Sequence, residues 1–221
     1  NMMISFTFRL LENRIENEKR IQQQINQQQG AQLLYLKSQI NPHFLFNALN
    51  NIYSLSVMKS DLTPKMILQL SNLLRYSIYE GQKDKVALAD EVEQINKYLE
   101  MFKMTKETPP NVSFQVQGNF NGWTIEPMTL IPLIENGIKH GDFDSNPNAF
   151  LNIDLQIDHE RLQFKTVNTT NPQNLQKDKV GGVGLVNIKT RLALRYPEYQ
   201  FETKDLGDRF EVLLALKNPN T

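Results

Sequence analysis

Cysteine is absent from the 221-residue sequence. This excludes disulfide bonds, thiolate metal sites and cysteine nucleophiles, and it fits a reducing compartment. No stretch reaches the roughly 20 apolar residues that a membrane-spanning helix needs. Neither sign of charge is in excess, since 24 basic residues balance 24 acidic ones. A chain without net charge has no overall field that would hold a polyanion, so we expect no direct binding to nucleic acid.

What is present is the composition of a folded protein. Hydrophobic residues make up 40% of the chain and charged residues 22%, which allows a buried core and excludes wholesale disorder. The length fits one large domain or two small ones. The first eleven residues are rich in apolar side chains, and two interpretations of them stay open: the end of a transmembrane helix, or a short packed helix.

The first half of the chain has the periodicity of helices. From Leu33 to Leu55 apolar residues recur every three or four positions, which predicts an amphipathic helix. A second helix is predicted to begin at Thr63–Pro64, with Thr63 as its N-cap, and to stop near Gly81. A third helix is predicted to end before Pro109–Pro110, where we expect a domain boundary.

In the second half the period alternates between that of strands and that of helices. Strands are predicted over residues 112–116, 151–157, 162–167, 201–203 and 210–216, and helices over 127–140 and 181–194. The polar stretch from Asn168 to Lys179 is predicted to be a loop. The predicted fold class is therefore α+β, with helices first and a mixed layer of helices and strands after them.

The first motif is the run from Leu36 to Asn50, with the sequence LKSQINPHFLFNALN. On a helix, His43 shares a face with Gln39, Asn47 and Asn50, so a polar stripe directs the imidazole toward solvent. A neutral imidazole can act as a nucleophile, because its pKa of about 6.5 leaves one ring nitrogen unprotonated at cytoplasmic pH. A single histidine on a helix is nevertheless more often structural, so this motif alone does not establish catalysis.

The second motif is the run from Ile131 to Gly141, with the sequence IPLIENGIKHG. On a helix, Glu135, Asn136 and Lys139 lie toward one side. The amide oxygen of Asn136 suits Mg²⁺, a hard cation that prefers oxygen ligands, and Lys139 and His140 can contact phosphate oxygens. The alternative is an ordinary ion pair between Glu135 and Lys139 on a surface helix, which would not require the asparagine.

The third motif is the run from Gly181 to Leu192, with the sequence GGVGLVNIKTRL. Glycines at the start of a helix let backbone amides approach a phosphate, and the helix dipole favours the anion. A glycine pair by itself also fits an ordinary helix start, so this motif gains meaning only from its order after the second one.

Together the three motifs resemble those of the LytS/YehU-type sensor histidine kinases, and the resemblance extends from about Leu33 to Leu216. The first is similar to the family's phosphoacceptor box, the second to the N box of GHKL ATPases, and the third to their second glycine box. The resemblance implies that His43 accepts the γ-phosphoryl group of ATP and that Glu135 acts as a base or an orienting group. It further implies a site for ATP and Mg²⁺ in which Asn136 binds the metal and the nucleotide contacts Asn136, Lys139, His140, Asn168, Gly182, Gly184, Leu185 and Asn187.

One position differs from most other histidine kinases, and two depart from the pattern of the family itself. Phe44 follows His43 where most other histidine kinases have an acidic residue, so the group that orients His43 must come from elsewhere. Gly137 stands where the family usually has alanine. The family's Asp-x-Gly-x-Gly box, whose aspartate accepts a hydrogen bond from adenine, is replaced by a run that begins with Asn168. Its neutral amide is expected to weaken ATP binding by on the order of 1 kcal/mol, and Asn168→Asp to restore it.

The resemblance also implies the organisation of the chain. Residues 1–32 would be a membrane-proximal signalling helix or linker, residues 33–108 a dimerisation and histidine phosphotransfer domain, and residues 109–221 the catalytic ATP-binding domain. Two helical hairpins would pair into a dimeric four-helix bundle, followed by a GHKL (Bergerat) α/β sandwich. The full-length protein would be anchored in a bacterial inner membrane, with this chain in the cytoplasm.

The function implied is that of a sensor histidine kinase of a two-component system. It would phosphorylate itself on His43 and pass the phosphoryl group to an aspartate of a response regulator, in this family a LytTR-type DNA-binding regulator. Asn47, one turn beyond His43, would position the water that removes phosphate from the regulator. The change at Asn168 suggests an alternative, a degenerate kinase that serves as a non-catalytic dimeric scaffold. A GHKL ATPase that only hydrolyses ATP is less favoured, because the His43 motif would then be idle.

Overall fold

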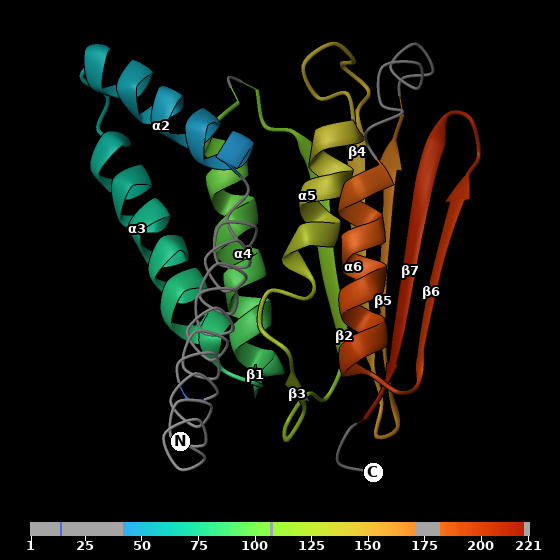
Figure 1. The fold of residues 1–221 in the computed structure, drawn as a ribbon. Coiled ribbons are helices and arrows are strands. Elements are labelled where there is room, and N and C mark those ends of the chain that lie inside the picture. Colours follow the sequence, from blue (N-terminus) through green and yellow to red (C-terminus); the bar gives the residue numbers. More distant parts are fainter. Residues whose placement is uncertain (1–13, 15–41, 107, 171–181, 219–221) are drawn as a thin grey trace, which may run out of the picture. The chain divides into compact units, whose positions relative to one another are not determined.

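The computed structural model describes residues 14, 42–106, 108–170 and 182–218 (Figure 1). The chain divides into two compact units, residues 1–45 and residues 46–221. Most of the predicted N-terminal helix, the first part of the phosphoacceptor motif and Gly181 lie outside the described residues. Among the described residues, no helix is long and apolar enough to cross a membrane.

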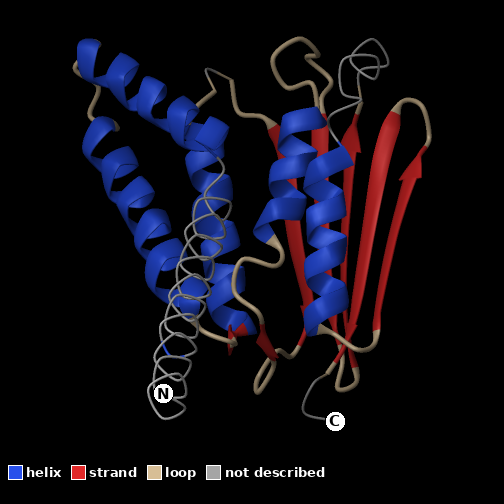
Figure 2. Cartoon of the chain, in the orientation of Figure 1, coloured by secondary structure: helices blue, strands red, loops and turns tan. Residues whose placement is uncertain are grey.

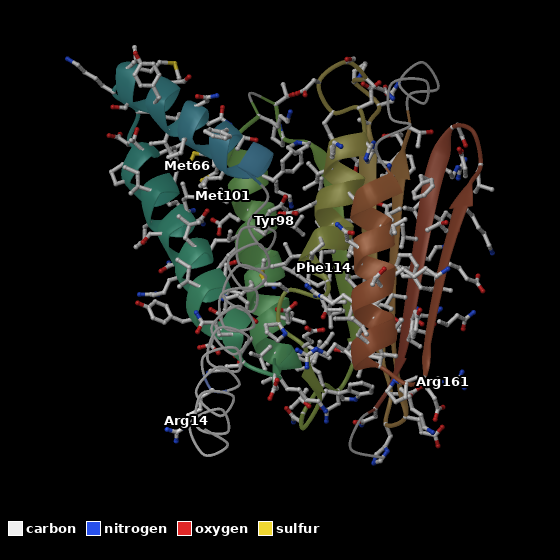
Figure 3. All side chains as sticks on the ribbon, in the orientation of Figure 1. Arg14, Met66, Tyr98, Met101, Phe114 and Arg161 are labelled. Carbon is white, nitrogen blue, oxygen red and sulfur yellow. The ribbon has the colours of Figure 1, made fainter. Side chains whose placement is uncertain are left out.

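Helices come first along the chain. They are α2 (Pro42–Val57), α3 (Thr63–Tyr79), the short 3-10 helix η1 (Glu80–Gln82) and α4 (Leu88–Met104). α3 and α4 contact each other, and both bury apolar side chains, among them Met66 on α3 and Met101 on α4, which are labelled in Figure 3. The three- and four-residue spacing of the buried positions explains why these segments pair as helices.

The start of α3 differs from the prediction. Leu62, not Thr63, occupies the N-cap position, and no side chain caps the helix. The Thr63 hydroxyl instead donates a hydrogen bond to the Ser60 carbonyl at 2.9 Å. Pro64 is in the first turn, as predicted, where its missing N–H is not needed.

A five-stranded mixed sheet forms the layer behind the last two helices (Figure 2). Its order is β2 (Asn111–Gly118), β4 (Phe150–Ile157), β5 (Arg161–Thr169), β7 (Arg209–Lys217) and β6 (Tyr199–Asp205). β2 and β4 are parallel, and the other neighbours are antiparallel. Helices α5 (Ile131–His140) and α6 (Gly182–Arg195) cover the same face of the sheet (Figure 1). The predicted α+β class and α/β sandwich are confirmed, while the dimeric bundle stays a prediction.

A second, two-stranded sheet is not predicted by the sequence pattern. β1 (Val86–Ala87) pairs in antiparallel fashion with β3 (Thr124–Ile125). Each strand has two residues, too few to show the alternation by which strands are recognised. The Leu88 amide, at the start of α4, also donates to the Trp123 carbonyl at 3.0 Å. The start of α4 is thereby hydrogen-bonded to the segment that leads into α5.

Two predicted boundaries in the second half are wrong. β5 continues through Asn168 and Thr169, which were assigned to the loop, because Asn168 is paired with Leu151 on one side and Phe210 on the other. The helix predicted from residue 127 begins at Ile131. Met128 has a positive φ of 58°, a conformation that an α-helix does not contain.

The backbones of the parallel strands β2 and β4 come close together where Gly118 lies opposite Ile157, and this contact gives a stability prediction. Gly118 has φ +103°, and an added Cβ would lie 1.8 Å from the Ile157 carbonyl oxygen. We expect Gly118→Ala to lower the free energy of unfolding by about 3 kcal/mol or more, because backbone must move. Gly122→Ala is the matched control: φ is also positive, but no atom lies within 4 Å, so about 1 kcal/mol is expected. Equal losses in urea unfolding would contradict the role given to close packing.

Candidate functional site

The second motif forms α5, and its apolar side faces the sheet. Ile131, Leu133, Ile134 and Gly137 are buried. Glu135 and Asn136 are half-buried and Lys139 is exposed. Among the described residues, no hydrogen bond of the Asn136 side chain is seen, so its amide is available to a ligand. The alternative of an ordinary Glu135–Lys139 surface pair stays open.

The C-terminal end of α5 is hydrogen-bonded to the end of β5. Thr169 donates a hydrogen bond from its hydroxyl to the Gly141 carbonyl at 2.6 Å. Gly137 packs tightly on the sheet, since an added Cβ would lie 2.7 Å from Leu151 Cδ1. The alanine usual in the family would thus require Leu151 to shift, which explains in physical terms why glycine suits this chain. His140, in the last turn, is half-buried.

Asn168 lies in the sheet beneath this helix and is fully buried. Its Nδ2 donates to the Thr169 carbonyl at 2.7 Å. Its Oδ1 has no hydrogen-bond partner among the described residues, and it lies 3.5 Å from the point where a Cβ of residue 137 would be. A buried acceptor without a donor is costly. The orientation of the amide thus leaves an acceptor that fits an amino group such as that of adenine.

The third motif forms the first turns of α6, next to α5 (Figure 1). Gly182 and Gly184 lie in its first turn, Leu185 is half-buried and Asn187 is exposed. The structure therefore brings the second motif, the third motif and Asn168 to one end of one face of the sheet. For Mg²⁺, the donor set offered here is the neutral oxygen of Asn136, which fits a cation that keeps several waters and phosphate ligands.

The first motif lies on α2. His43 is the second residue of that helix, and Asn47 lies four residues beyond it. His43 belongs to the first compact unit, and the residues predicted to bind the nucleotide belong to the second. Apolar side chains further along α2 are exposed, with Tyr53 71% and Val57 64% accessible.

The sequence analysis missed a group of buried polar residues before α5. Glu91 on α4 is fully buried, and its Oε1 accepts hydrogen bonds from the Tyr76 hydroxyl and the Met128 amide, each at 2.8 Å. Arg191 on α6 donates to the Met128 carbonyl at 2.5 Å and lies 3.6 Å from the buried carboxylate of Glu126. One signal could have found Glu91: it lies three and four residues from Leu88 and Ile95, on the apolar face of its helix.

Burial changes the ionisation of two of these α4 side chains. Burial raises the pKa of Glu91, and hydrogen bonds from the Met128 backbone and the Tyr76 side chain oppose that rise. Burial also raises the pKa of Tyr98, and the charge of Glu135 raises it further. Tyr98, labelled on α4 in Figure 3, therefore keeps its proton and lies within electrostatic reach of Glu135 on α5.

Comparison with known proteins identifies relatives of the chain. A histidine kinase family model matches residues 31–108. The sensor protein LytS of Oceanobacillus iheyensis is 26% identical over 204 residues, covering 85% of this chain and 35% of that protein. The sensor histidine kinase BtsS of Escherichia coli is 33% identical over 111 residues, covering 50% of this chain and 20% of that protein. The chain thus spans about a third or less of the length of these relatives.

Among solved structures, the catalytic domain of the histidine kinase ThkA is similar. The match covers 61% of this chain and 95% of that domain, with 14% sequence identity and a TM-score of 0.43.

The orientation of the Asn168 amide predicts that Asn168→Asp lowers the stability of the fold but raises its affinity for nucleotide. In Asn168→Asp a buried carboxylate oxygen faces the Thr169 carbonyl in place of the donor that binds it now. We expect the free energy of unfolding to fall by about 2 kcal/mol or more at neutral pH. Binding of an ATP analogue should nevertheless tighten several-fold, because the charged acceptor gains more from the base's amino group.

Asn152→Asp is the matched control for this prediction. Asn152 lies on the exposed side of β4 and accepts a hydrogen bond from Ser113 through Oδ1, an oxygen that aspartate retains. Calorimetry should show no change in nucleotide affinity for Asn152→Asp. Unchanged or weaker binding by Asn168→Asp would mean that another group contacts the base.

Proposed function

Because a histidine kinase family model matches residues 31–108 and the chain is similar to LytS sensor proteins, we propose that it is the kinase region of a two-component sensor histidine kinase. The observation that carries this proposal is the meeting of α5, α6 and the unpaired Oδ1 of Asn168 at one place in the fold. The second and third motifs lie more than 40 positions apart in the sequence, as Asn136 and Gly182 show. In this proposal they form one site.

The proposed reaction transfers the γ-phosphoryl group of ATP to His43. A bond forms between the unprotonated ring nitrogen and the γ-phosphorus as the bond from that phosphorus to the bridging oxygen breaks, and ADP leaves. Such a transfer depends mainly on in-line positioning and neutralisation of charge. Mg²⁺ supplies that neutralisation when it is bound, and Asn136 is the residue that would hold it. Glu135 acts as the base or as the group that orients the imidazole.

The other residues of the site bind the nucleotide. Lys139 and His140, in the last turn of α5, contact phosphate oxygens, and Asn168 accepts a hydrogen bond from the adenine amino group. Four residues at the start of α6 line the phosphate end: Gly182, Gly184, Leu185 and Asn187. The first turn of a helix suits this role because its backbone amides and its dipole favour an anion.

The phosphoryl group then passes from His43 to an aspartate of a response regulator, for which a LytTR-type DNA-binding regulator is proposed. Asn47 positions the water that later removes the phosphoryl group from that regulator. We keep the three-part organisation with boundaries at residues 32 and 108 as part of the proposal, with the full-length protein anchored in a bacterial inner membrane and this region in the cytoplasm.

Exposed apolar side chains on α2 and α3 support a homodimer. On α2 the exposed apolar side chains are Phe46, Leu49, Tyr53 and Val57, and Met58 directly after the helix is exposed as well. On α3 they are Ile67, Leu68, Ile78 and Tyr79. So many large apolar side chains on two adjacent helices are unusual for a monomer. Pairing of two such hairpins would bury them in a four-helix bundle.

The transfer reaction gives the principal prediction. Incubation of the chain with Mg·[γ-³²P]ATP should produce an acid-labile, base-stable label, as expected of a phosphoramidate. His43→Gln should remove the label and leave nucleotide affinity nearly unchanged. His159→Gln is the matched control, because His159 is exposed in the turn between β4 and β5 and should label normally.

Two outcomes of this assay would contradict the proposal. Label at the level of the unchanged protein in His43→Gln would exclude His43 as the acceptor. Normal labelling by Asn136→Ala would exclude the metal site assigned to α5. Nucleotide binding without any label in the unchanged protein would favour the non-catalytic scaffold, the alternative that the change at Asn168 suggests.

The dimer gives a second prediction. Light scattering at tens of micromolar should show a dimer, and Tyr53→Asp should shift it toward monomer because a charge would enter the apolar interface. Leu206→Asp is the control, since Leu206 is 54% exposed in the turn between β6 and β7 and lies outside α2 and α3. A monomeric unchanged protein, or dissociation by Leu206→Asp alone, would contradict the bundle.

A further inference from the structure

Glu91 is a carboxylate in an apolar setting. It is on α4 with 0% of its surface exposed, and no described basic side chain forms an ion pair with it within 4 Å. Burying a carboxylate without a cation is costly unless hydrogen bonds compensate. If its role were only to hold α3 against α4, the hydrogen bond to Tyr76 could be made by a neutral side chain. Glu91 Oε1 also accepts a second hydrogen bond, from the Met128 amide, and that bond calls for an explanation of its own.

The second hydrogen bond leads from the hairpin to α5. Glu91 Oε1 accepts the Met128 amide at 2.8 Å, and the Leu130 backbone is also among the groups that stabilise the charged form. Leu130 is the N-cap of α5, and that helix has no side-chain cap of its own. Glu91 thus holds, from α4, the backbone that leads into α5, a helix whose first turn has no side-chain cap.

The same segment is held from the other side by α6. Arg191 Nη2 donates to the Met128 carbonyl at 2.5 Å and to the Thr129 hydroxyl at 3.2 Å. The Tyr196 hydroxyl accepts a hydrogen bond from the Glu126 amide at 2.8 Å. Residues 126–130 are therefore fixed between α4 and α6, with Met128 in a left-handed conformation that is unfavourable for a residue with a side chain.

We propose that Glu91 is a positioning residue for the metal end of the nucleotide site, acting through the Met128 amide and the start of α5. This inference rests on the proposed function, since it assumes that Asn136, in the second turn of α5, binds Mg²⁺. Asn136 is only five residues from the first residue of its helix, so a tilt or fraying of the first turn displaces its amide. Loss of the Glu91 carboxylate frees that turn while α6 still holds the Met128 carbonyl.

The test measures how much Mg²⁺ tightens the binding of a fluorescent ATP analogue to the full chain. The dissociation constant is measured once with a chelator and once with magnesium chloride. The first value divided by the second is the magnesium effect, and this ratio is compared between the unchanged protein and variants of Glu91. Glu91→Met fills the volume without an acceptor and removes the buried charge, so the fold should persist. We expect its ratio to fall by about tenfold or more, the usual effect of losing a group that orients a metal ligand.

Two further variants separate positioning from packing. Glu91→Gln keeps a carbonyl oxygen that can accept the Met128 amide, so it should restore most of the magnesium effect. Tyr76→Phe deletes the hydrogen bond within the hairpin but leaves the one to Met128, so its ratio should match that of the unchanged protein. Glu93→Ala is the control on the same helix, because Glu93 is exposed and pairs with Lys97.

The outcomes distinguish this inference from the proposed function. An unchanged ratio in Glu91→Met, or an equal loss in Tyr76→Phe, would overturn the role of Glu91 while the unchanged protein still binds Mg·ATP. If the unchanged protein binds no nucleotide, the proposed function fails and this inference fails with it. Thermal midpoints recorded without nucleotide check that each variant is folded. If Glu91→Met is unfolded, loss of the magnesium effect in Glu91→Gln or in Tyr76→Phe would overturn the inference, because both variants keep an acceptor for the Met128 amide.

Discussion

The hydrogen bonds around residues 126–130 are the constraint on which the second unit depends. This segment receives Glu91 from α4 and Arg191 from α6, and it leads directly into α5. Each of these polar groups would be expensive to bury alone, and the hydrogen bonds to the Met128 amide and carbonyl offset part of that cost. Because α4 and α6 both bind this short stretch of backbone, a movement of either helix would displace the start of α5.

The geometry of the proposed nucleotide site depends on that arrangement and on the sheet. The start of α5 is fixed by Glu91, and its end is fixed by the hydrogen bond from Thr169 to Gly141. Asn168 lies between these two points, with its Oδ1 unpaired among the described residues. Because Nδ2 faces the Thr169 carbonyl, Oδ1 is the atom of the amide left to accept, and an aspartate at this position would also present an acceptor. This is the physical argument against treating the change at Asn168 as a loss of nucleotide binding.

Much of this could be predicted from the sequence because it is local. The periodicity of α3, α4 and the strands depends on which residues a helix or strand places on one face, and those predictions were confirmed within a few residues. The errors came from non-local effects. Asn168 and Thr169 look like loop residues by composition, but Asn168 pairs with both β4 and β7 and Thr169 pairs with β7, so both belong to β5. β1 and β3 are too short to have a period, and each exists only because the other is beside it.

The sequence by itself determined the α+β class, the order of the elements and the three motifs that identify the relatives of the chain. Those features reside in neighbouring residues and need no knowledge of distant contacts. Only the tertiary structure decided which residues are joined: Glu91 to Met128 over 37 positions, and Arg191 to Met128 over 63. The reason is that a glutamate in a helix has the same local preferences whether its carboxylate meets water or a distant backbone amide. Its partner is chosen by the packing of α4, α5 and α6, which no local pattern records.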